Sequence, residues 1–274
     1  IDLNQNSGAG ATVFVNLEGN LDIKAPSQLI STDDGCKYVF SKSGIQTISN
    51  ASSLGLGQRV DFEVASGSTT RLTNQNFPLT NATNNFAVLT GGILEFNYFD
   101  LTGSGVFDLN TLGTLRITSS NGVNTTGAIG NVLSTGTRTF SQTGIYHYVG
   151  NISPQITGTA MTAGSSSKRI IVDKSNATDV VNLTQSTGTT NELYIVRGVF
   201  TETELANISG SGNLTMDTDG KYITSVTSAT VPRLSGTYSL NGSSTIELNA
   251  SANQELRGSR NYRNLTFSTS GPKT

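Results

Sequence analysis

Tyr38-Val39-Phe40-Ser41-Lys42-Ser43-Gly44-Ile45-Gln46 is the clearest copy of a pattern that this chain contains three times. The pattern returns without a gap at 246–254 and with one extra residue at 146–155. The closing glutamines are 109 and then 99 residues apart. Self-similarity at a nearly constant spacing is typical of repeat architectures. The sequence therefore predicts an extended array rather than a compact enzyme.

A glycine-rich pattern repeats with a similar period. The segment 101–113 aligns with 208–220 around Gly-Ser-Gly, and a fainter copy begins at 7–10. Two patterns that recur in the same order, about every 100 residues, predict one continuous β-helical segment over 1–274. Since the copies follow one another without a Pro-rich or charged linker, we expect an excerpt of a longer repeat protein that continues into neighbouring repeats.

The composition favours many short strands joined by polar turns. Only 35% of the residues are hydrophobic and 13% are charged, and roughly half are Gly, Ser, Thr or Asn. A net charge of −2 excludes a broad basic surface for nucleic acid. No apolar stretch approaches the roughly 18 residues that span a membrane. The single cysteine, Cys36, excludes an internal disulfide, which fits a bacterial surface better than a disulfide-dense secreted domain.

Alternating apolar residues predict short strands, each with one buried and one wet face. The predicted strands are 12–17, 37–40, 59–64, 86–89, 93–96, 106–109, 114–117, 145–149, 169–172, 180–183, 193–196, 221–224, 237–240, 245–248 and 264–267.

Two all-β architectures accommodate these strands. A right-handed parallel β-helix with coils of about 20 residues is favoured, because corresponding strands start 19–24 residues apart, as at Ile93 and Thr114, Val199 and Lys221, or Thr245 and Asn264. Tandem Ig-like β-sandwiches of about 100 residues are the alternative.

The candidate binding residues form one basic cluster with an aromatic partner. Arg257, Arg260, Tyr262 and Arg263 are able to grip an anionic glycan through bidentate guanidinium contacts and stacking. The simpler interpretation is that these arginines occupy outward positions on adjoining strands.

Asp217 and Asp219 precede Gly220 as in part of a calcium loop. The corresponding segment 110–113 lacks both carboxylates, which favours a solvated turn. The sequence therefore predicts no metal site and no cofactor.

Catalytic groups are sparse. The close acid groups are Asp33 with Asp34, Asp61 with Glu63, and Glu202 with Glu204; residues two apart on a strand share a face, so Asp61 and Glu63 form the best pair. His147 and Cys36 lack partners at ligand or nucleophile spacing. The sequence predicts no catalytic site.

The repeats resemble those of very large surface proteins of Bacteroidota. The resemblance rests on residues 236–254, 262–267 and 146–158. The family includes gliding-motility adhesins exported by type IX secretion. It implies a β-helical stalk that is secreted to the bacterial cell surface and contacts surfaces or polysaccharides.

We therefore expect a non-catalytic structural and adhesive stalk segment of a large extracellular adhesin, used for surface attachment or gliding. The alternatives are a β-helical polysaccharide lyase or hydrolase and a glycan-binding module. Three or more acidic or basic residues that converge in a groove would favour the enzyme.

Overall fold

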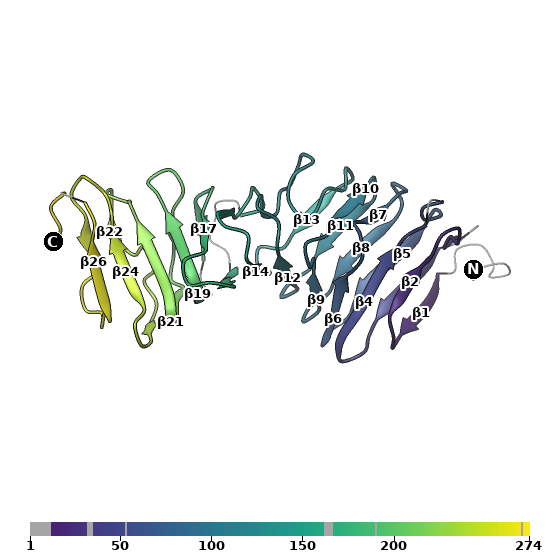
Figure 1. Ribbon diagram of the computed structural model, residues 1–274, viewed down its shortest axis with the longest axis horizontal. Helices are drawn as coiled ribbons and strands as arrows, with labels where there is room; N and C mark the ends of the chain where they lie inside the picture. Colours follow the sequence, from purple (N-terminus) through teal and green to yellow (C-terminus); the bar gives the residue numbers. More distant parts are fainter. Residues whose placement is uncertain (1–11, 32–34, 53, 162–166, 190, 270) are drawn as a thin grey trace. The chain divides into compact units, whose positions relative to one another are not determined.

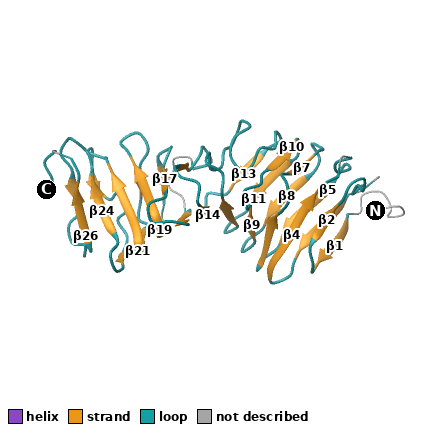
Figure 2. Ribbon diagram, viewed as in Figure 1, coloured by secondary structure: helices purple, strands orange, loops and turns teal. Residues whose placement is uncertain are grey.

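The computed structural model describes residues 12–31, 35–52, 54–161, 167–189, 191–269 and 271–274. Within these residues the regular structure consists of strands and contains no helix (Figure 2). The strands pair in parallel with strands of the neighbouring coils, so the fold is a right-handed parallel β-helix. The alternative of Ig-like sandwiches is wrong, because sandwiches are built from antiparallel sheets.

The chain divides into two compact units. The N-terminal unit comprises residues 1–118 and 124–144, and the C-terminal unit comprises 119–123 and 145–274. The glycine-rich copy at 7–10 lies outside the described residues, as do Asp33 and Asp34. The prediction of one continuous segment over 1–274 stays a prediction.

The N-terminal unit has two long sheet faces and a short third one (Figure 1). The first face contains, in order, β1 (Val13–Leu17), β3 (Cys36–Phe40), β5 (Val60–Val64), β8 (Asn85–Val88), β11 (Val106–Leu109) and β13 (Arg138–Phe140). The second contains β2 (Leu21–Ile23), β4 (Gly44–Asn50), β6 (Ser68–Leu72), β9 (Ile93–Glu95) and β12 (Thr114–Ile117). The third contains β7 (Phe77–Leu79) and β10 (Leu101–Gly103).

The C-terminal unit is organised in the same way. One run of paired strands joins β14 (Ile145–Gly150), β16 (Arg169–Lys174), β19 (Glu192–Glu202), β21 (Asn213–Thr224), β24 (Thr245–Leu248) and β26 (Asn264–Phe267). Beside them lie β15 (Gln155–Ile156), β17 (Val180–Asn182) and β23 (Tyr238–Leu240). The short pairs are β18 (Thr187–Gly188) with β20 (Ile208–Ser209), and β22 (Thr230–Val231) with β25 (Glu255–Leu256).

The register confirms the spacing expected from the sequence. Ile93 lies opposite Thr114, Val199 opposite Lys221, and Thr245 opposite Asn264, so each of these predicted pairs marks one full coil. Most other coils also fall within the predicted range, as in the step from Cys36 to its partner Val60, which lies at its upper end. Each turn of the chain therefore returns a residue to a place directly beside its counterpart.

Inward side chains stack into ladders along both cores. In the N-terminal unit, the rings of Tyr38, Phe62 and Phe86 stack with centroids 5.8 and 5.9 Å apart. In the C-terminal unit, Phe200 and Tyr222 stack at 6.0 Å. Parallel pairing places identical faces of successive strands in line, so one inward position per coil builds a continuous apolar column.

A tight turn recurs where the chain passes from one strand of a coil to the next. In it, a backbone N–H donates to the carbonyl three residues earlier, as at Ser68 to Ala65, Gly92 to Leu89, Gly113 to Asn110, Gly144 to Ser141 and Ser244 to Asn241. The repeating structural unit is therefore a single coil, much shorter than the long period seen in the sequence patterns.

The three motif glutamines are all buried and reach the preceding coil. Gln46 donates to the carbonyls of Leu17 and Gly19, at 2.8 and 2.7 Å. Gln155 donates to Ser119, and Gln254 donates to Thr224 and Val226. The strand before Gln46 belongs to the first face, whereas the strands before Gln155 and Gln254 are β14 and β24. The three copies thus share the hydrogen bonds from a buried glutamine to the preceding coil, but they do not occupy the same position in the coil.

Candidate functional site

The candidate site is a cluster that we call the Arg–Tyr surface: Tyr238, Arg257, Arg260, Tyr262 and Arg263. The Tyr238 and Tyr262 rings meet edge to face, with centroids 6.2 Å apart. The Arg260 guanidinium carbon lies 5.1 Å from the Tyr238 ring centroid, within cation–π range. Sequence reasoning missed Tyr238, although it precedes Tyr262 by about the length of one coil.

Backbone carbonyls hold the three arginines in place. Arg257 Nε donates to the Pro232 carbonyl at 3.0 Å, Arg260 Nη2 to Ser235 at 2.8 Å, and Arg263 Nε to Leu240 at 2.9 Å. Each accepting carbonyl lies on the preceding coil. A guanidinium has five N–H donors, so this anchoring leaves most of them for other acceptors.

Two shallow pockets flank Tyr238 and share Asn261. One, of about 440 Å³, is lined by Asn213, Ser235, Gly236, Thr237, Tyr238, Ser259, Arg260 and Asn261. The other, of about 430 Å³, is lined by Tyr238, Ser239, Leu240, Asn241, Asn261, Tyr262 and Arg263. Each of the two pockets is therefore lined by an aromatic ring, an arginine, and hydroxyl or amide groups.

Asp217 and Asp219, the weak metal candidates, lie within strand β21 rather than in a turn. The register of β19 and β21 shifts at this point, so the pair sits at a bulge. Asp217 accepts hydrogen bonds from the Tyr194 hydroxyl at 2.6 Å and from Asn241 at 3.1 Å. Asp219 forms an ion pair with Arg197 at 3.4 Å. Both carboxylates are thus engaged by neighbouring coils.

Asp61 and Glu63 share the outward face of β5, as the alternation predicts. Glu63 pairs with Lys37 of the preceding coil at 3.1 Å. Asp61 accepts the backbone N–H of Asn85 at 2.8 Å, and burial raises the pKa of Asp61. Glu63 thus contacts the preceding coil and Asp61 the following coil, so the two acids connect three successive coils.

Glu202 and Glu204 do not form a pair, because Glu202 is buried and Glu204 is exposed. The Glu202 carboxylate accepts the Ile208 N–H at 2.8 Å and the Thr224 hydroxyl at 2.9 Å. Burial raises the pKa of Glu202. This carboxylate fastens a loop of its own coil to the next coil.

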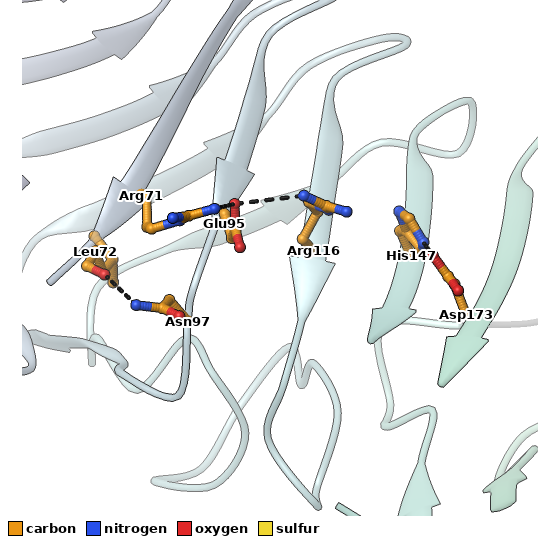
Figure 3. Close-up of polar contacts among 7 residues, drawn as sticks. All are labelled: Arg71, Leu72, Glu95, Asn97, Arg116, His147 and Asp173. Atoms are coloured by element: carbon orange, nitrogen blue, oxygen red, sulfur yellow. Dashed lines mark hydrogen bonds and ion pairs between the residues drawn. The ribbon is translucent and has the colours of Figure 1, made fainter. Parts of the chain in front are cut away.

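Charged side chains on the second face of the N-terminal unit form a row (Figure 3). Arg71, Glu95 and Arg116 occupy one register position on β6, β9 and β12. The Glu95 carboxylate lies 3.0 Å from Arg71 and 3.5 Å from Arg116. Sequence reasoning missed this row, although its members follow one another at about one coil length. The row lies on the outside of a sheet, and its opposite charges face one another.

His147 lies near Asp173 of the next coil in the C-terminal unit (Figure 3). The distance from Nε2 to the carboxylate is 3.5 Å. His147 is on the outward face of β14, away from the inward rings of Tyr146 and Tyr148, as the alternation predicts. Unlike the arginine–glutamate row, the pair does not share one register position, because His147 lies opposite Ile171 and Asp173 lies opposite Val149.

A buried lysine at the end of β16 was also missed. Lys174 donates to the Gln155 side chain at 2.8 Å and to the Val149 carbonyl at 3.1 Å. Its relative exposure is 2%, and burial lowers its pKa to about 8. Lys174 thereby connects one of the motif glutamines to the coil that follows it.

Within the described ranges, no three His, Cys, Asp or Glu side chains are arranged to hold a metal ion. Nor does this part of the chain contain a helix that is long and apolar enough to cross a membrane. Comparison with protein-family models, with curated proteins and with solved structures gives no match for this chain.

Proposed function

We propose that this chain is a non-catalytic structural and adhesive segment of a large bacterial cell-surface adhesin. The observation that carries the proposal is the set of buried glutamines that bind carbonyls of the preceding coil in both units. Buried side-chain amides with all their partners fix one arrangement of neighbouring coils, because an unpaired buried polar group is costly. Such a design suits a segment that has to keep its shape under load.

The outward faces support the same proposal. Their charges pair across coils, as in Lys37 with Glu63, Arg71 with Glu95, and Arg169 with Glu192. A catalytic pocket works through charges that face a substrate, whereas these charges face one another. The extracellular location and the adhesin class rest on the resemblance of the repeats to Bacteroidota surface proteins.

Mechanical loading tests the structural role. The chain is held by its two ends at constant force, and its extension is followed beside that of a variant with Gln46, Gln155 and Gln254 replaced by Ala. We expect the native chain to keep its length at forces that extend the variant. Equal extension of the two proteins would contradict the proposal.

Incubation with soluble polysaccharides tests the non-catalytic role. We expect no new reducing ends and no unsaturated sugar products. Release of either product with turnover would instead identify a hydrolase or a lyase on the same coil.

A further inference from the structure

The Arg–Tyr surface differs in its charge balance from the outward sheet faces of this chain. Lys37, Arg71, Arg116, Arg169, Arg197 and Lys221 each have a carboxylate within 4.0 Å. Among the described residues, no carboxylate approaches the guanidinium nitrogens of Arg257, Arg260 or Arg263 that closely. A chain with a net charge of −2 thus concentrates three uncompensated positive charges on one surface.

The donors of these arginines are held in place but not used up. Each guanidinium has five N–H donors, and the contact with the preceding coil uses one of them. Arg260 Nη2 and Arg263 Nε are tied to carbonyls of the preceding coil, which fixes the two guanidinium planes beside separate pockets. Fixed guanidinium groups with free N–H donors recognise carboxylate and sulfate groups, because the paired donors match paired oxygens.

The remaining pocket groups match a sugar. Asn213, Asn241, Asn261, Ser235 and Ser259 provide amide and hydroxyl groups. The Tyr238 ring lines both pockets, and the ring of Tyr262 lines one of them. Both pockets thus combine groups that bind hydroxyls, a group that binds anions and an aromatic ring, which match the hydroxyls, acidic groups and apolar ring faces of an acidic polysaccharide.

We infer that the Arg–Tyr surface binds an acidic polysaccharide, with one acidic sugar at each pocket. Arg260 binds the anionic group of one residue and Arg263 that of the other, while Tyr238 lies between them. This inference rests on the adhesive part of the proposed function and names its ligand class. A neutral glycan makes no use of the three positive charges, and single-stranded nucleic acid makes little use of the amide and hydroxyl lining.

Titration of the intact chain with four polymers tests the inference. Polygalacturonate carries carboxylates, dextran sulfate carries sulfates, dextran is neutral, and oligo-dT is an anion without sugar carboxylates or sulfates. We expect binding of one or both acidic polysaccharides, weakening as NaCl is raised, and at least tenfold weaker binding of dextran and oligo-dT. Equal binding of dextran, equal or tighter binding of oligo-dT, or no binding of either acidic polysaccharide would overturn the inference.

Matched variants locate the site. Arg260→Gln and Arg263→Gln each remove one anchored guanidinium, and we expect each to weaken binding by about tenfold, the effect of one charge-assisted hydrogen-bonded contact. Arg169→Gln removes the same charge from a site that is paired with Glu192, and we expect less than a twofold change. Equal losses of affinity in all three variants would mean that only net charge determines binding. They would overturn the assignment of the binding site to the Arg–Tyr surface.

Folding and function are separated by two further comparisons. Circular dichroism establishes whether each variant is folded. If Arg260→Gln does not fold, the test rests on Arg263→Gln alone, because Arg263 contacts a different backbone carbonyl from Arg260. The loading experiment above is independent of the ligand. A chain that resists load but binds no acidic polysaccharide refutes the inference and leaves the structural role, whereas a chain that binds and cleaves the polymer refutes the non-catalytic role.

Discussion

The N-terminal and C-terminal units bury different kinds of polar groups in the same type of coil. Among the described residues of the N-terminal unit, every buried polar side chain is neutral, as in Gln46, Thr70 and Asn131. The C-terminal unit buries ionisable side chains as well: Lys168, Lys174, Asp179 and Glu202. Burying a charge requires dedicated partners, so the two units depend on different interactions for the same fold.

The difference shows that the coil geometry sets few requirements on any one inward position. Apolar ladders, amide clamps and a lysine–glutamine contact all fit between strands in parallel register. The buried amides that clamp the coils find their partners on the preceding coil, as Gln46 does with the Leu17 carbonyl. Stability in the N-terminal unit should therefore depend mainly on packing, and stability in the C-terminal unit on packing and charge together.

The largest expected effect comes from the aromatic ladder of the N-terminal unit. Phe86 is fully buried and stacks on Phe62. We expect Phe86→Ala to lower the free energy of unfolding by about 3–5 kcal/mol, because a cavity replaces the ring. Hydrogen exchange with urea unfolding measures the change and locates it. Ile195→Ala in the C-terminal unit is the comparison, with an expected loss of about 2–5 kcal/mol in the free energy of unfolding. A loss below about 1 kcal/mol for Phe86→Ala would refute the packing argument.

The next effect tests the buried charge. Gln155→Leu removes the side-chain acceptor of Lys174 at 2.8 Å and leaves the Val149 carbonyl. We expect a loss of about 2–3 kcal/mol in the free energy of unfolding, since a buried charged donor loses one of its partners. Adding Lys174→Met removes the stranded charge and should restore part of that loss. Denaturant titration of the two single variants and the double variant gives the coupling. If the two losses simply add, Lys174 and Gln155 are not coupled and the contrast between the units fails here.

Much of this fold could be predicted from the sequence because most strands show their alternation. The predicted strands 106–109, 114–117, 245–248 and 264–267 coincide with β11, β12, β24 and β26. β4 and β6 escaped prediction because Gln46, Ser68 and Thr70 occupy inward positions that are usually apolar. The hydrophobic pattern is hidden wherever polar side chains occupy inward positions.

The site was less predictable, because its groups come from successive coils. Tyr238 joins Tyr262 only once the coil length is known. Lys174 follows the inward Ile170 and Val172 in strict alternation, and Glu202 follows the inward Phe200. Both lie beyond the predicted strands 169–172 and 193–196, and the general rule that charges stay outside argues against extending the alternation to them. The hydrogen-bond partners that compensate the burial of Lys174 and Glu202 include groups on neighbouring coils, so a local sequence pattern does not identify them.

A pH-dependent difference between the units is the third prediction. Burial lowers the pKa of Lys174 from 10.5 to about 8. Between these values the unfolded chain binds more protons than the folded chain, so the free energy of unfolding should rise as the pH rises from about 8 to 10.5. The raised pKa of Glu202 acts in the opposite sense, with stability falling as the pH rises from 4.5 through that pKa.

Denaturant unfolding of the native chain and of Lys174→Met at several pH values measures this effect. The difference between the two proteins should change steadily over the alkaline window and stay constant just below it, because other titrating groups are common to both. A constant difference across the whole window would mean that Lys174 keeps an ordinary pKa in the folded chain.

The smallest expected effect lies in the corner turns, which do not depend on either type of core. Gly67 and Gly91 have positive φ values, of 77° and 74°, at the third position of successive turns, and Leu112 has the same conformation with φ 55° in the next coil. Because a Cβ atom is strained in this region, Leu112→Gly should raise the free energy of unfolding by about 0.5–1 kcal/mol, after the greater flexibility of glycine in the unfolded chain is counted. Gly91→Ala is the reverse test and should destabilise the chain, since its Cβ would lie 2.8 Å from the Ser66 hydroxyl oxygen. Thermal and urea unfolding measure both changes. If Leu112→Gly is destabilising, the contacts of the exposed leucine side chain outweigh its backbone strain. The turn would then depend on the side chains of its own unit, as the core does.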